Sequence, residues 1–164
     1  MPDHPVEPAI GPDDGPEGPL GPSSWASLVH QLADAVLVVD RAGTITSWND
    51  AAERVFGWTA AEAVGRNLDL IIPERFRARH WDGYQRVIET GTTRYGSTLL
   101  EVPALHRDGE PRSIAFTVTV LTDPAGRVQR LVAVVRDDTA RWQERRRLLA
   151  ELEALRVDRS PPEG

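Results

Sequence analysis

The chain of 164 residues contains neither cysteine nor lysine. The absence of cysteine excludes disulfides, thiolate metal sites, cysteine nucleophiles and covalent cysteine adducts of a flavin. The absence of lysine excludes chemistry that needs a lysine amine. No other nucleophile has a sequence-evident base beside it, and the paired acids Asp137 and Asp138 resemble a strand exit and helix cap. We therefore expect a protein that is not an enzyme.

Long apolar runs and a basic charge excess are also missing. No segment approaches the roughly 18 consecutive apolar residues that span a bilayer, and the start lacks the basic and apolar regions of a secretion signal. Five acids and no arginine precede Trp25, so this segment carries most of the net charge of −6. The remainder is nearly neutral, which argues against direct nucleic-acid binding. We expect a cytoplasmic protein without membrane contact.

Proline and glycine are concentrated at the start of the chain. Residues 1–22 hold seven of the 13 prolines and four glycines, with hardly any large apolar side chain. Such a segment cannot bury enough surface to offset the entropy lost on ordering. The composition predicts a disordered acidic leader over residues 1–23, a domain over 24–140 that includes an N-terminal flanking helix, and a C-terminal helix and tail over 141–164.

Alternating apolar residues and turn signals predict strands in two groups. The first two strands flank a turn at residues 40–43, and later turns at 107–109 and 123–126 separate three more strands. Pro103 predicts a bulge or a sheet edge because proline cannot donate a ladder hydrogen bond. The predicted strands cover residues 35–40, 44–48, 95–106, 113–120 and 128–135.

Capping patterns and apolar periodicity predict the helices. Asp50 with Glu53, and Thr59 with Glu62, have the spacing of capping boxes. The predicted helices are one capped by Ser23 or Ser24, one from Asp50 that stops at Gly57, a short one after Thr59 ending near Gly65, one over residues 74–89, and one introduced by Asp137 that runs to about Arg156.

This order of elements resembles the PAS family over roughly residues 24–141. Four segments carry the resemblance: residues 32–58, the Ile-Pro-Glu-Arg entry to the long helix at 72–75, the Arg-Asp-Gly turn at 107–109, and the exit Val-Val-Arg-Asp-Asp-Thr at 134–139. The resemblance implies an α+β fold with a five-stranded antiparallel sheet, short helices on one side, flanking terminal helices and a small central pocket.

The candidate pocket lies along the long helix, where His80 falls in the middle of an apolar stripe. The segment from Pro73 to His80 resembles oxygen-sensing haem-PAS kinases, and this resemblance implies His80 as an axial ligand of haem iron and Arg86 as a propionate contact. Those kinases place an oxygen-binding arginine where this chain has Leu100, so carbon monoxide or nitric oxide fits better than oxygen. The predicted pocket residues are Phe76, His80, Tyr84, Arg86, Leu100, Ile114, Phe116 and Val118.

Alternatives to a haem site remain open. His80 could instead be a buried helix histidine that bonds a backbone carbonyl. Trp48, Trp58 and Trp81 could stack on a flavin, although aromatic side chains in a small domain more often belong to the core or an interface. His106, beside a turn, reads as an exposed strand end.

The resemblance implies a sensory module of the kind attached to two-component kinases, other signalling enzymes or transcription factors. Such a module would bind a small ligand or a partner and pass the change to its C-terminal helix. The alternative is a ligand-free scaffold that forms a homodimer or binds a signalling protein. The predicted interface residues are Trp25, Leu28, Leu148, Leu152 and Leu155.

Overall fold

A computed structural model describes residues 21–93, 96 and 98–158 as a five-stranded antiparallel sheet with helices, in the strand order β2-β1-β5-β4-β3. This confirms the α+β prediction. The predicted leader, as far as residue 20, and the end of the predicted C-terminal tail, residues 159–164, lie outside the described residues. The elements are α1 (Pro22–Gln31), β1 (Ala35–Asp40), β2 (Ile45–Trp48), α2 (Asp50–Phe56), α3 (Ala60–Ala63), the 3-10 helix η1 (Leu68–Leu70), α4 (Glu74–Thr90), β3 (Leu100–Leu105), β4 (Pro111–Thr122), β5 (Val128–Asp137) and α5 (Thr139–Asp158).

Aspartate side chains close two of the hairpin turns. Asp40 Oδ1 accepts hydrogen bonds from the backbone N–H groups of Ala42 and Thr44, both at 2.9 Å. Asp123 Oδ1 accepts from Ala125 and Arg127 in the same pattern at 2.9 Å. A side chain that satisfies turn N–H groups in this way pre-forms the reversal. These turns set the β1–β2 and β4–β5 registers.

Strand β3 forms one edge of the sheet, which is one of the two alternatives, a bulge or an edge, that Pro103 predicts. Pro103 faces Ser113 of β4, and β3 pairs with β4 alone. The missing N–H therefore costs no ladder hydrogen bond. The strand is shorter than predicted because it begins at Leu100, and the predicted start at Tyr95 lies outside the described residues.

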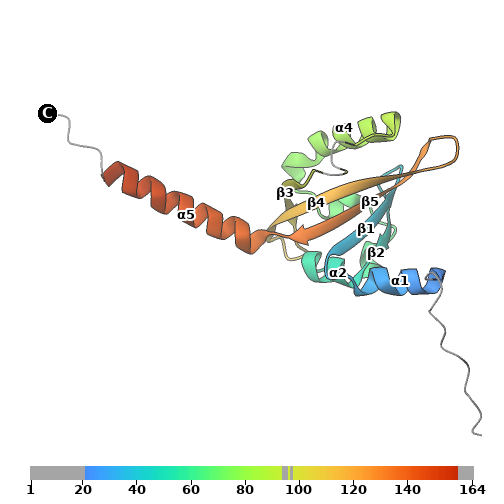
Figure 1. Ribbon diagram of the computed structural model, residues 1–164, viewed down its shortest axis with the longest axis horizontal. Coiled ribbons are helices and arrows are strands. Elements are labelled where there is room, and N and C mark those ends of the chain that lie inside the picture. Colours follow the sequence, from blue (N-terminus) through green and yellow to red (C-terminus); the bar gives the residue numbers. More distant parts are fainter. Residues whose placement is uncertain (1–20, 94–95, 97, 159–164) are drawn as a thin grey trace, which may run out of the picture.

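Helix α4 lies over one face of the sheet (Figure 1). Its observed bounds confirm the helix predicted over residues 74–89. Tyr84, the buried residue of this helix, donates a hydrogen bond from its hydroxyl to the carbonyl of Asp40 at the β1–β2 turn. Trp81 Nε1 donates to Asp69 Oδ1 at 2.8 Å. These two bonds anchor α4 above the sheet.

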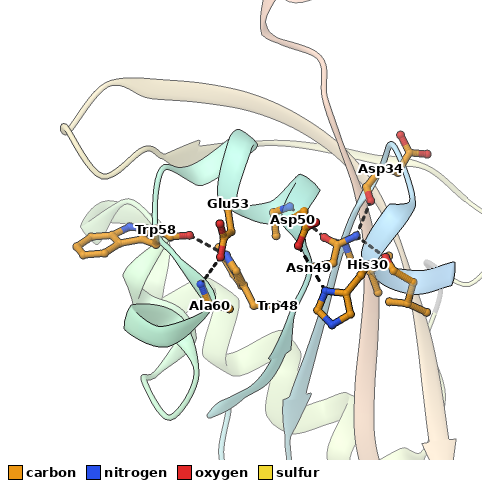
Figure 2. A network of polar contacts seen from close by, with 11 residues as sticks. His30, Asp34, Trp48, Asn49, Asp50, Glu53, Trp58 and Ala60 are labelled. Atoms are coloured by element: carbon orange, nitrogen blue, oxygen red, sulfur yellow. Dashed lines mark hydrogen bonds and ion pairs between the residues drawn. The ribbon is translucent and has the colours of Figure 1, made fainter. Parts of the chain in front are cut away.

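Of the two predicted capping boxes, one is confirmed and one is wrong. Thr59 and Glu62 form the predicted capping box at α3. The residue that caps α2 is Asn49, not Asp50, and its Oδ1 accepts from the N–H of Ala52 at 3.0 Å. Asp50 is the first helical residue and contacts His30 of α1 at 3.4 Å, as Figure 2 shows.

Asn49 also joins three segments of the chain (Figure 2). Its Nδ2 donates to the carbonyls of Val29 in α1 and Asp34, at 2.9 and 3.1 Å, and its Oδ1 accepts from the N–H of Val36 in β1 at 2.8 Å. The side chain is 1% exposed. Asn49 therefore attaches the N-terminal helix to the domain.

Helix α1 begins differently from the prediction. The serine caps predicted for α1 are wrong: Gly21 holds the N-cap position and Pro22 opens the helix, which suits the fixed φ of proline.

Helix α5 extends away from the sheet (Figure 1). Among the described residues, no helix is long and apolar enough to cross a bilayer.

Candidate ligand-binding site

A cavity of about 470 Å³ lies between α4 and the sheet. This volume is within the usual range of small-molecule sites. Alternate residues of β1, β4 and β5 face it, because successive strand side chains point to opposite faces, and the edge strand β3 lines it along residues 100–104. From the strands, the apolar lining consists of Leu37, Val39, Leu100, Val102, Pro103, Ala104, Ile114, Phe116, Val118, Leu131, Ala133 and Val135. The cavity can therefore receive an apolar body.

Most of the predicted pocket residues line this cavity. They are Phe76, His80, Tyr84, Leu100, Ile114, Phe116 and Val118. Arg86 does not: it lies two positions beyond Tyr84, about 200° around the helix, and its side chain is exposed. The propionate contact implied for Arg86 is therefore not supported by its position.

His80 lines the cavity among mainly apolar side chains. Its Nδ1 is buried and, within the described part of the chain, has no hydrogen-bond partner. The carbonyl contact expected of a satisfied helix histidine is thus not formed. Burial lowers the pKa of His80 below its ordinary value, and the Asp69 carboxylate opposes this by less. The imidazole is therefore neutral near physiological pH and able to donate, accept or bind a metal through a ring nitrogen.

The cavity rim carries two charged residues that sequence reasoning missed. Arg79 precedes His80 on α4, and Glu101 follows Leu100 on β3. Glu101 Oε2 accepts a hydrogen bond from the guanidinium Nη2 of Arg145 in α5 at 2.9 Å. Strand alternation could have indicated Leu37, Val39 and the β5 residues of the wall, but no local pattern marks these charges, since they depend on how α4 and α5 meet the sheet.

The three tryptophans considered for flavin stacking lie elsewhere. Trp48 is 2% exposed and packs against Phe56 in the core, with 5.3 Å between ring centroids. Trp58 lies beneath the guanidinium groups of Arg66 and Arg107, at 5.3 and 5.0 Å from its ring centroid. Trp81 packs on the β1–β2 turn. None of these tryptophans lines the cavity.

The prediction that His106 is an exposed strand end is wrong. Its side chain is half-buried and lies against Gly57, whose position leaves no room for a Cβ. Its Nδ1 lies 2.8 Å from a carboxylate oxygen of Asp108 in the following turn. The ring thus joins the end of β3 to the end of α2.

The predicted interface residues are all exposed. They lie on α1 (Trp25, Leu28) and α5 (Leu148, Leu152, Leu155). Trp142 and Leu149 of α5 are exposed as well and were not predicted. Their exposure leaves both terminal helices with apolar side chains available for contact.

Comparison with known proteins supports the fold, and one of the similar proteins is a sensor protein. The PAS fold family profile matches residues 24–137. An uncharacterised protein of Azorhizobium caulinodans is 36% identical over 82% of the chain and 18% of its own length. Sensor protein FixL of Bradyrhizobium diazoefficiens is 34% identical over 55% of the chain and 21% of its own length. The chain thus spans about a fifth of the length of these relatives.

Among solved structures, the PAS domain of the RpfR quorum-sensing receptor from Cronobacter turicensis, in complex with C12:0, superposes with a TM-score of 0.54. It is 19% identical and covers 66% of this chain and 97% of that domain. At this identity the likeness concerns the fold alone. Together with the family match over residues 24–137, the strand order and the sensor relative, these findings establish that the chain belongs to the PAS family of sensory domains.

Proposed function

We propose that this PAS domain is a signal-input module that binds a small, largely apolar molecule in the cavity beneath α4, with His80 as a polar anchor. The observation that carries the proposal is His80 itself, which lines this largely apolar cavity and whose buried Nδ1 has no partner among the described residues. A buried polar atom without a hydrogen bond is costly, so a ligand group that meets it would gain affinity. The C12:0 complex of the RpfR domain supports a ligand inside this fold.

Haem is the specific candidate that His80 favours. Neutral imidazole is a common axial ligand of haem iron, and burial keeps His80 neutral. When bound, haem would supply an iron that binds diatomic gases. His80 would hold the iron, and the apolar lining, with Leu100 on β3, would exclude water from the gas. Leu100 offers no hydrogen bond to oxygen, which favours carbon monoxide or nitric oxide.

Reconstitution with haemin tests this candidate. We expect the wild-type chain to develop a Soret band and His80→Ala to lose or shift it, because the axial nitrogen is removed. His106→Ala is the matched control, since His106 is also half-buried but does not line the cavity. Absorption spectra of the three proteins provide the measurement. A wild type without a Soret band, or a band unchanged in His80→Ala, would refute iron ligation by His80.

We further propose that the signal leaves through α5. Strand β3 lines the cavity from Leu100 to Ala104, so a ligand that displaces β3 also displaces Glu101. Glu101 pairs with Arg145 of α5 at 2.9 Å, and Arg145 holds the pKa of Glu101 below its ordinary value. Thr139, at the start of α5, accepts a hydrogen bond from the N–H of Ser113 at 3.0 Å. The ion pair therefore links a cavity wall to a helix suited to contact a kinase, a transcriptional output or a second copy.

Hydrogen exchange of α5 tests the ion pair. We expect Arg145→Gln to speed amide exchange over residues 139–146 by about two- to fivefold, a small effect because the pair is solvent-exposed. Arg147→Gln is the control, since Arg147 pairs with Glu144 and Glu151 inside α5 and does not reach β3. Equal amide exchange in Arg145→Gln and wild type would show that this ion pair does not couple the cavity wall to α5.

A further inference from the structure

Arg79 is a cation at the cavity without a partner. It lines the cavity from α4 and, within the described part of the chain, forms no hydrogen bond, ion pair or ring contact. The neighbouring arginines are engaged: Arg77 donates to the carbonyls of Ile72 and Asp69 at 3.2 and 3.1 Å, and the Arg75 guanidinium lies 4.7 Å from the Phe76 ring centroid. Arg79 is thus available to a ligand.

The remaining charges of the lining leave that cation uncompensated. Glu101 is the acidic residue of the described lining, and Arg145 already binds its carboxylate. His80 is neutral, and the Tyr84 hydroxyl donates to the Asp40 carbonyl. The cavity therefore combines an apolar interior with one free positive charge at its rim.

We propose that Arg79 binds the carboxylate of a ligand whose apolar body fills the cavity. This inference rests on the proposed function, because it requires the cavity to hold a small molecule. Burial of the apolar body would supply most of the affinity. The carboxylate would stay at the rim, where Arg79 is solvent-exposed, and would thus avoid the cost of deep burial. A guanidinium binds a carboxylate through two parallel hydrogen bonds.

Two kinds of molecule share this chemistry, a straight-chain fatty acid and a porphyrin that carries carboxylates. Dodecanoate, dodecan-1-ol and haemin distinguish them in equilibrium titrations of the full chain, followed by calorimetry or tryptophan fluorescence. The variant is Arg79→Gln. The control is Arg86→Gln on the same helix, because Arg86 is also exposed but does not line the cavity. Circular dichroism verifies that both variants are folded.

We expect the wild type to bind dodecanoate about tenfold more tightly than dodecanol, the usual size of a charge-assisted hydrogen bond. Arg79→Gln should remove this difference and leave the affinity for dodecanol unchanged, whereas Arg86→Gln should behave as wild type. If haemin binds instead of the fatty acid and Arg79→Gln weakens it by a similar factor, the carboxylate belongs to a porphyrin and the role of Arg79 stands.

The inference is overturned if dodecanoate binds no more tightly than dodecanol and haemin does not bind, or if Arg79→Gln leaves the affinity for every carboxylate probe unchanged. Binding of dodecanol alone would overturn the role of Arg79 and leave the proposed cavity function intact. Failure of all three probes to bind the wild type would overturn both.

Discussion

Replacement of Asn49 by alanine is expected to lower the free energy of unfolding by about 3 kcal/mol, since several buried backbone groups lose their partners at once. The N–H groups of Val36 and Ala52 lose their acceptor, and the carbonyls of Val29 and Asp34 lose their donor. With Asn49 only 1% exposed, water cannot replace these bonds without a rearrangement. Chemical denaturation monitored by circular dichroism measures the loss.

Asn67→Ala is the matched control for this substitution. Asn67 also caps a helical turn, where its Oδ1 accepts from the N–H of Asp69 at 2.8 Å, but it is exposed and makes this single side-chain bond. The loss expected there is about 1 kcal/mol or less. Equal losses at the two positions would show that the contacts of Asn49 beyond its cap bond contribute nothing. A larger loss at Asn49 should be accompanied by faster amide exchange in α1, which Asn49 attaches to the domain.

Substitution of Gly43 by alanine is expected to cost about 3 kcal/mol, for two separate reasons. The residue has a φ of 80°, where a side chain is strained by roughly 1 to 2 kcal/mol. A Cβ would also overlap the Trp81 ring. That ring is hydrogen-bonded to Asp69 and packs edge-on against Tyr84, so it cannot move without disturbing α4. Thermal unfolding measures the loss of stability, and titration with dodecanoate or haemin reports whether the cavity changes.

Gly109→Ala separates the two causes. Gly109 has a φ of 86°, but a Cβ there would meet nothing within 4 Å. Its loss should therefore be about 1 kcal/mol, the cost of the backbone conformation alone. If Gly43→Ala and Gly109→Ala are equally destabilising, overlap with the Trp81 ring adds nothing to the cost of the backbone conformation.

Local patterns were sufficient for most of the fold. The capping box at Thr59 and the α4 stripe are confirmed, and of the two alternatives that Pro103 predicts, a bulge or an edge, the structure has the edge. Each depends on residues within a few positions of one another, where steric preferences and single hydrogen bonds decide the outcome. The same local signals did not distinguish Asn49 from Asp50 as a cap, because Asn49 is selected by contacts with α1 and β1 as well as by the helix that it begins.

The sequence by itself determined the order of strands and helices and the helix face that carries His80, because periodicity and turn chemistry are local properties. The PAS fold was implied by the resemblance of that order and of four short segments to the family. Only the tertiary structure decided what surrounds that face. It turned Arg86 away from the cavity and brought Arg79 to its rim, since helix rotation against the sheet selects the lining. It also paired Glu101 with Arg145, residues 44 positions apart that no local pattern relates.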